Sequence, residues 1–236
     1  MAGRRVLLFV TVLVVVSAGV AAGAAPGQVA PDQVPMYGGL DRQADPILKG
    51  ADAALIEGTT REFGSRRAAS QRFVDQGFRF YFLDDLATAM RRFNQGWLLD
   101  PENPGVYYGF MAVLNDREEN CEARKMGERA FELGLEKKAI ALADAGRMNA
   151  LCVAQDQTLD DDTKSAFIKK SSEYYTQALL VEPNSAYVYG SWATAAYWLG
   201  DYESAWRYVK LERKHGGKTA KSFLKLLKAK MPEPKS

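Results

Sequence analysis

The stretch 70–103, SQRFVDQGFRFYFLDDLATAMRRFNQGWLLDPEN, decides the fold of this chain. Aromatic and small residues recur in it at helical spacing and a proline closes it; these residues are Phe73, Gln76, Gly77, Phe80, Ala89, Phe93, Gly96 and Pro101. Small side chains let two helices approach closely, and the neighbouring rings fill the space beside the crossing. The proline then stops the second helix, which is expected at 86–99. The stretch therefore predicts a hairpin of two packed helices.

A partial copy of this pattern ends at Pro183. Tyr175 and Ala178 precede Pro183 at the offsets at which Phe93 and Gly96 precede Pro101. The chain resembles the tetratricopeptide repeat (TPR) family, which has aromatic, small, alanine and proline residues at these places. The resemblance implies repeats at 70–103, 104–137, 138–185 and 186–219. Because one hairpin cannot bury its own apolar face, it also implies an all-α fold, a right-handed α-solenoid of about four TPR-like hairpins.

The segments on either side of 70–219 are also expected to be helical. Asp45 is a good N-cap with Pro46 at the first helical position, so an extra N-terminal helix is predicted at 46–62, within the segment 45–65. At the other end, 220–236 holds an amphipathic helix and tail, with apolar residues on one face and lysines on the other: Ala220, Phe223, Leu224, Leu227 and Met231 against Lys221, Lys225 and Lys228. We expect a capping helix; a helix lying on a membrane surface is the alternative.

The middle of the chain matches the pattern less well. Repeat two has Gly127 where the family usually has an aromatic residue. Two repeats would separate the two prolines by about 68 residues, whereas Pro101 and Pro183 lie 82 apart. We place the extra residues in a long loop at 155–163, between helices at 138–153 and 163–181. The aspartates 160–162 in it are interpreted as a helix cap, because a calcium loop would need a glycine and a distal glutamate.

The first 24 residues have the features of a signal peptide. Arg4 and Arg5 precede an apolar run at 6–16, and small residues lead to a cleavage site after Ala24. A periplasmic or secreted location in a bacterium is therefore expected. If the segment were not cleaved, its length would allow it to anchor the protein in a membrane.

The segment 25–44 is expected to be a flexible linker. Its first part is rich in Pro, Gly, Gln and Ala and holds too few apolar residues to fold alone. The alternative is that the part around Met36 and Tyr37 folds back into the groove of the repeats.

Two cysteines, Cys121 and Cys152, remain after removal of the signal peptide. They fall at about the same height on two helices that should be antiparallel neighbours. In an exported protein this arrangement favours a disulfide.

Charge is divided unevenly along the chain. The net charge is +2, yet the residues from Arg207 onward carry +8 and the segment 25–206 carries −8. This asymmetry is typical of a protein with an anionic partner, or of one whose own parts attract each other.

Catalytic signals are weak. The one histidine, His215, precedes Gly216 and Gly217 at a helix end, where it complements the helix C-terminus. A single histidine gives no metal cluster and no catalytic triad, and no phosphate-binding glycine loop or basic base-stacking patch is present. We therefore predict no enzyme, no cofactor, no metal site and no nucleic-acid partner.

The resemblance also implies a binding surface, since the first helix of each TPR repeat lines a concave groove. Its groove positions correspond to Gln71, Val74, Phe78, Tyr81 and Phe82 in repeat one, to Tyr108, Ala112, Asn115 and Asp116 in repeat two, and to Tyr187, Thr194, Tyr197 and Trp198 in repeat four. Such a surface would accept a peptide or a partner helix, and the expected function is a non-catalytic scaffold or assembly factor of the bacterial cell envelope.

Three alternatives stay open from the sequence. The aromatic residues of the groove could instead pack against the N-terminal helix 46–62 as core. The protein could be a membrane-tethered adaptor with an uncleaved anchor. It could also be a small-ligand carrier or enzyme that uses an aromatic pocket.

Overall fold

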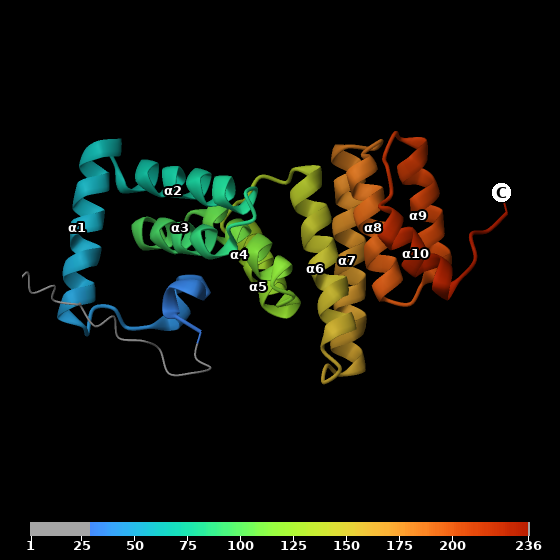
Figure 1. Cartoon of the computed structure of the whole chain (residues 1–236), viewed down its shortest axis with the longest axis horizontal. Helices are drawn as coiled ribbons and strands as arrows, with labels where there is room; N and C mark the ends of the chain where they lie inside the picture. The colour runs from blue at the N-terminus through green and yellow to red at the C-terminus, as the bar shows by residue number, and fades with distance from the viewer. Residues whose placement is uncertain (1–28, 236) are drawn as a thin grey trace, which may run out of the picture. The chain divides into compact units, whose positions relative to one another are not determined.

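The computed structural model describes residues 29–235, so the expected signal peptide lies outside the described residues. Over that range the chain is helical and contains no strand, which confirms the all-α prediction (Figure 1). Two short 3₁₀ helices come first, η1 (Pro31–Gln33) and η2 (Pro35–Gly39). The α-helices are α1 (Pro46–Phe63), α2 (Arg66–Tyr81), α3 (Leu86–Leu99), α4 (Pro104–Asp116), α5 (Asn120–Glu132), α6 (Ala139–Gln155), α7 (Asp161–Val181), α8 (Ala186–Trp198), α9 (Tyr202–Lys214) and α10 (Lys221–Lys230).

Consecutive helices pack in pairs, and the pairs stack on one another. The closest partners are α2 with α3, α4 with α5, α6 with α7, and α8 with α9. Helix α4 also packs on α2 and α3, and α6 packs on both α5 and α8. The core therefore continues from each pair to the next within the unit 31–236.

The two proline turns that are similar in sequence are also similar in structure. Tyr107 donates its hydroxyl hydrogen bond to the carbonyl oxygen of Pro101 at 2.9 Å, and Tyr189 donates to that of Pro183 at 3.1 Å. In each case the tyrosine lies six residues after the proline. The internal repeat therefore extends to the hydrogen bonds of the turns.

Close packing in the first two pairs depends on glycines that face Phe93. The Phe93 side chain on α3 is fully buried. A Cβ atom on Gly77 of α2 would lie 2.4 Å from the Phe93 ring, and one on Gly109 of α4 would lie 2.3 Å from it. Because real Cβ atoms do not approach so closely, the ring occupies space that only two glycines leave open. Phe93 thus joins three helices.

Gly127, which stands where an aromatic residue was expected, also allows two helices to pack closely. A Cβ there would lie 2.6 Å from Sδ of Met111, which is itself buried. The packing of α5 on α4 is therefore closer, and the flexible methionine fills the space.

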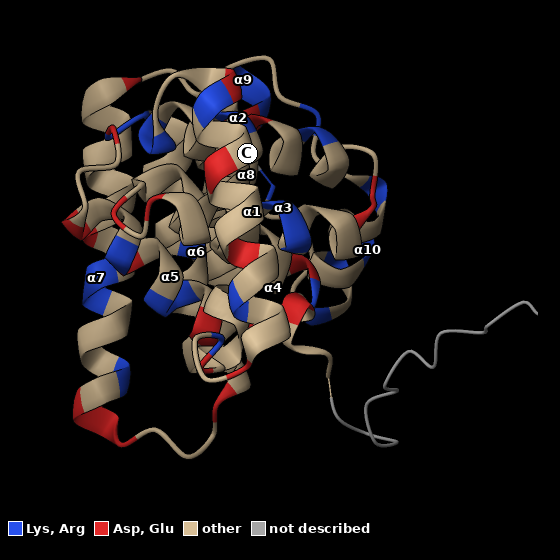
Figure 2. Cartoon of the chain, turned by 90° about the vertical axis from the view of Figure 1, so that its left-hand side faces the viewer, with Lys and Arg blue, Asp and Glu red and all other residues tan. Residues whose placement is uncertain are grey.

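The extra residues of the third pair lie in its helices and not in a long loop. Only residues 156–160 separate α6 from α7, and these helices have 17 and 21 residues, against 13 in each of α8 and α9. The loop predicted at 155–163 is too long because Asp160 caps α7, accepting a hydrogen bond from the backbone N–H of Thr163 at 2.8 Å. Asp161 and Asp162 then form the acidic first turn of α7. Figure 2 shows acidic residues in red at the lower end of this helix.

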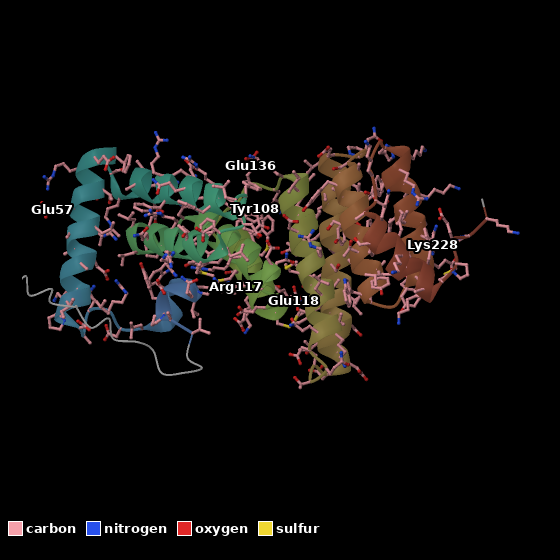
Figure 3. The ribbon with its side chains drawn as sticks, viewed as in Figure 1. Glu57, Tyr108, Arg117, Glu118, Glu136 and Lys228 are labelled. Atoms are coloured by element: carbon pink, nitrogen blue, oxygen red, sulfur yellow. A yellow bond between two sulfur atoms is a disulfide. The ribbon has the colours of Figure 1, made fainter. Side chains whose placement is uncertain are left out.

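Residues 31–39 differ from the flexible linker expected at 25–44. The Asn94 side chain on α3 donates to the carbonyl oxygens of Asp32 and Val34 at 3.0 and 2.9 Å and accepts from the backbone N–H of Tyr37 at 3.1 Å. Arg117, which Figure 3 shows near the blue N-terminal segment, donates to the carbonyl oxygen of Gln33. The segment folds back, as the alternative supposed, but it packs on α3 and not in a groove.

Two residues of this segment adopt the left-handed conformation, Met36 with a φ of 52° and Tyr37 with a φ of 54°. This conformation is costly for residues other than glycine. Two contacts offset that cost. Tyr37 is buried, with 7% of its surface exposed, and the Arg42 guanidinium lies 4.1 Å from the centre of its ring.

The two end helices cover the ends of the core. Helix α1 packs Leu55, Ile56 and Phe63 on a cluster of Ala69, Phe73 and Leu99. At the other end Leu227 of α10 is fully buried, and the Trp206 indole donates to the carbonyl oxygen of Met231 at 3.0 Å. The apolar stripe of α10 therefore packs on α9, as expected of a cap.

A disulfide joins Cys121 of α5 to Cys152 of α6, as predicted from their heights on neighbouring helices. It closes a loop of 31 residues and contributes about 4 kcal/mol in the chain-entropy account. A disulfide is compatible with an oxidising compartment. Among the described helices, none combines the length and apolar character that crossing a membrane requires.

The packing of Phe93 gives a direct prediction for stability. Replacement of Gly109 by alanine forces a methyl group against the ring, so Gly109→Ala should lower the free energy of unfolding by about 2 kcal/mol in urea titrations followed by circular dichroism. Gly58→Ala on the exposed side of α1 is the matched control, because a Cβ there has no neighbour within 4 Å. It should raise the free energy by about 0.5–1 kcal/mol through helix propensity. Equal effects of the two substitutions would contradict this packing.

Candidate binding groove

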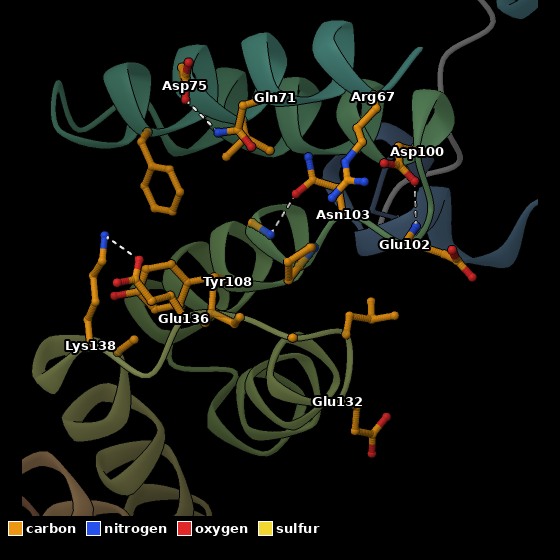
Figure 4. Close-up of a pocket in the computed structure, with 18 of the residues that line it drawn as sticks. Arg67, Gln71, Asp75, Asp100, Glu102, Asn103, Tyr108, Glu132, Glu136 and Lys138 are labelled. Carbon is orange, nitrogen blue, oxygen red and sulfur yellow. Dashed lines mark hydrogen bonds and ion pairs between the residues drawn. The ribbon is translucent and has the colours of Figure 1, made fainter. Parts of the chain in front are cut away.

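A cavity of about 1260 Å³, here called the trough, opens between α2, the start of α4, the α5–α6 connection and the start of α6 (Figure 4). Four of the residues predicted for the groove line it: Gln71, Val74, Phe78 and Tyr108. The first helices of successive pairs therefore do meet at a common hollow.

The aromatic floor of the trough is held by the core beneath it. The Phe78 ring lies 5.1 Å from the Phe93 ring and 5.7 Å from the Tyr108 ring, measured between centroids. Val74 is buried and fits against Gly105, where a Cβ would lie 3.1 Å from its Cγ1. The floor is thus an extension of the packing around Phe93.

Polar contacts fix the turn at the rim. Asn103 caps α4 by accepting from the backbone N–H of Gly105 at 2.9 Å, and its amide donates to Oγ of Ser70 at 3.0 Å. The Ser70 hydroxyl in turn donates to the carbonyl oxygen of Gly96 at 2.8 Å. This chain of hydrogen bonds ties α2, α3 and α4 together at the mouth of the trough.

Asp144 of α6 lies at the centre of a polar cluster that joins three first helices. Its carboxylate accepts from the hydroxyl of Tyr108 on α4 at 2.8 Å and from the hydroxyl of Tyr187 on α8 at 2.5 Å. It also forms an ion pair with Arg147 of the same helix, at 2.9 Å. Figure 3 shows Tyr108, which belongs to α4, in the region between α4 and α6. The cluster therefore links the trough to α8.

Burial and the Asp144 carboxylate set the protonation of this cluster. Burial, followed by the negative charge of Asp144, raises the pKa of Tyr108 and of Tyr187 above the usual range of a phenol. Burial disfavours the charge of Arg147 and lowers its pKa, but Asp144 together with the neighbouring Tyr187 and Tyr175 outweighs burial, so that the pKa of the guanidinium is raised. The hydroxyls therefore stay protonated and donate, and the arginine stays charged.

Two smaller cavities continue along the first helices. One of about 330 Å³ is lined by Arg147, Tyr187, Ser191, Thr194, Glu212 and Phe223, among others. Another of about 350 Å³ lies beside Trp198 and is lined by Asn115, Glu118, Asn120 and Leu151, among others. Of the predicted groove residues, Tyr187 and Thr194 thus line the former, and Asn115 and Trp198 the latter.

Some predicted groove residues lie elsewhere. Tyr197 is only 9% exposed and packs on Phe223 of the capping helix, with ring centroids 5.6 Å apart, so it belongs to the core. Phe82, at the end of α2, is 79% exposed and borders none of the described cavities. Tyr81 lies half-buried beside both Phe78 and Phe82.

Asp144 and Arg147 were missed by sequence reasoning because no groove positions were assigned to the third repeat, in which the extra residues were placed. Counted from 143, the groove spacing falls on 144, 147, 151, 154 and 155. Arg147 and the last three of these residues line cavities. The repeat spacing thus contained the signal, but the extra residues in this pair displaced it.

Other expectations concern the surroundings of the trough. Helix α1 adds no residue to its lining, so within the described chain the N-terminal helix does not fill it.

His215 follows α9 and stacks on Tyr189, with ring centroids 5.3 Å apart. Across residues 29–235 there is no group of three His, Cys, Asp or Glu side chains that could hold a metal ion.

Comparisons with known proteins add no relative. No protein-family model matches the chain, and no curated protein is detectably similar to it. The function is therefore argued from the residues of the chain itself.

The cluster around Asp144 can be tested by removing one charge or both. Asp144→Ala leaves Arg147, whose side chain is 21% exposed, without its carboxylate and should cost about 3 kcal/mol of unfolding free energy. The double variant Asp144→Ala/Arg147→Met should be more stable than Asp144→Ala alone, because no uncompensated charge remains. Glu57→Ala, which breaks an exposed ion pair with Arg61, is the control and should have little effect. Additive losses in the double variant would contradict the coupling.

Proposed function

We propose that this chain is a non-catalytic protein-binding module of the bacterial cell envelope, a scaffold or assembly factor that holds a peptide or partner helix along its first helices. One observation carries the proposal: aromatic and polar side chains of α2, α4, α6 and α8 line a row of cavities that the Asp144 cluster connects. Rigid aromatic surfaces with a few polar groups are typical of protein-binding sites.

The proposal includes a TPR-like, right-handed solenoid as the architecture. The stacked pairs, the small residues at the helix crossings and the matching turns at Pro101 and Pro183 support it. In such an array the first helix of each repeat faces one side, which leaves a continuous surface for a partner.

The envelope location rests on two independent observations. The sequence begins with a basic, apolar and small-residue pattern that ends at Ala24, and the disulfide between Cys121 and Cys152 suits an oxidising compartment. Both favour export of the chain.

Site-specific photocrosslinking in bacteria tests the proposal. A photoreactive residue at Gln71, which is exposed and lines the trough, should form a defined crosslinked product with an envelope protein. The same residue at Glu57, on the outer side of α1, is the control and should not form it, because it borders no cavity.

Two results would count against the proposal. Identical products from both positions, or none from Gln71, would contradict a binding role for the trough. A purified protein that begins at Met1 rather than Ala25 would contradict export by cleavage, although it would leave the binding role intact.

A further inference from the structure

We propose that the partner held in the trough is a basic peptide segment whose lysine or arginine side chains meet the carboxylates of the rim. This inference deepens the proposed function and rests on it. Its grounds are the charges of the lining, their pairing, and the shape of the floor.

Acidic side chains outnumber basic ones around the trough. Its lining holds five carboxylates and two cations: Asp75, Asp100, Glu102, Glu132 and Glu136 against Arg67 and Lys138. One of the two cations is already neutralised, since Lys138 forms an ion pair with Glu136 at 3.0 Å. The field inside the hollow therefore attracts positive charge.

Three of the carboxylates are available to a partner. Within residues 29–235, Asp75, Asp100 and Glu102 take part in no ion pair. Asp75 accepts from the Gln71 amide at 2.9 Å, and Asp100 accepts from the backbone N–H of Glu102 at 3.1 Å (Figure 4). Each carboxylate still has free acceptor capacity, because two oxygens provide about four lone pairs.

The floor suits the apolar stems of basic side chains. Phe78 and Tyr108 form an aromatic surface at the bottom, and Ile140, which is 50% exposed, borders it at the start of α6. Lysine and arginine place their methylene groups on apolar surfaces while their charged ends reach polar groups. A cation can also lie over an aromatic ring. An acidic or purely apolar peptide would use only part of this lining.

The second cavity has a carboxylate of its own. Glu212 of α9 lines it and is 9% exposed, and it accepts a hydrogen bond from the Thr219 hydroxyl. Arg147, which lines the same cavity, is engaged by Asp144. A basic segment that extends from the trough along α6 would therefore meet another negative group.

The charge of the segment that forms the trough agrees with this choice of partner. The segment 25–206, which forms the trough, carries a net charge of −8. Diffusing basic segments are steered toward such a surface, and the attraction weakens as salt increases.

Peptide binding to the full-length chain tests the inference. We would measure fluorescence anisotropy with three labelled peptides of repeating sequence Lys-Leu-Ala, Gln-Leu-Ala and Glu-Leu-Ala, in which the first residue of the repeat is basic, neutral or acidic. The lysine peptide should bind about tenfold more tightly than the glutamine peptide at low salt, and the glutamate peptide most weakly. The preference should fade in about 0.5 M salt.

A matched pair of variants locates the effect. Asp75→Asn/Asp100→Asn/Glu102→Gln removes the three unpaired carboxylates and should weaken binding of the lysine peptide about tenfold. Glu57→Gln/Glu62→Gln/Glu173→Gln changes the net charge equally at sites outside the trough and should weaken it much less. Thermal unfolding of both variants checks that the fold is retained.

Each other outcome overturns the inference. Equal binding of the three peptides would leave a groove without a preference for basic partners, and the proposed function would stand. Crosslinking from Gln71 together with tightest binding of the glutamate peptide would assign an acidic partner. Self-association of the full-length chain that Lys221→Gln/Lys225→Gln/Lys228→Gln abolishes would identify the occupant as the capping helix of a second copy. Failure of all three peptides, with no product from Gln71, would reject both proposals.

Discussion

The insertion of the Phe93 ring between Gly77 and Gly109 is the constraint on which the rest of the structure depends. The ring comes from α3, and the two glycines come from the first helices of the first and second pairs, so one contact fixes three helices. Phe78 and Tyr108 then rest on this packing and form the floor of the trough. The position and shape of the trough therefore depend on glycine, rather than a larger residue, at positions 77 and 109.

The polar cluster around Asp144 links the second, third and fourth helix pairs. Asp144 receives hydrogen bonds from tyrosines on α4 and α8 and pairs with Arg147. A largely buried ion pair contributes little net stability, but it demands specific partners and so sets the relative positions of the helices that carry them. The disulfide between α5 and α6 holds the same junction covalently. Together these contacts keep the cavities in a row.

Local signals in the sequence predicted the helices well. Asp45 and Asp85 cap α1 and α3 through hydrogen bonds to nearby backbone N–H groups, and Gly64, with a φ of 82°, ends α1. The helix expected at 86–99 has those bounds in the structure because its cap and the following Pro101 are both local features. The proximity of the two cysteines followed from their similar distances from the joint between two helices that were expected to be antiparallel neighbours.

Features that depend on distant contacts were not predictable in the same way. Residues 31–39 have little tendency to fold, and they are ordered because Asn94, some 60 residues away, satisfies their backbone groups. The extra residues in α6 and α7 left the third pair without assigned groove positions, so the contacts of Asp144 and Arg147 were not predicted. The burial of Tyr197 under α10 depends on how the last helix returns, which repeat spacing does not encode.

The most direct test of the central claim is a double-mutant cycle between Phe93 and Gly109. Phe93→Leu shortens the side chain that occupies the slot, and the free energy of unfolding of both single variants and the double variant would be measured in urea. If the ring and the glycine constrain each other, Gly109→Ala will cost at least about 1 kcal/mol less in the Phe93→Leu background than in the native chain. Strictly additive free energies would show that the two residues act independently and would contradict the account.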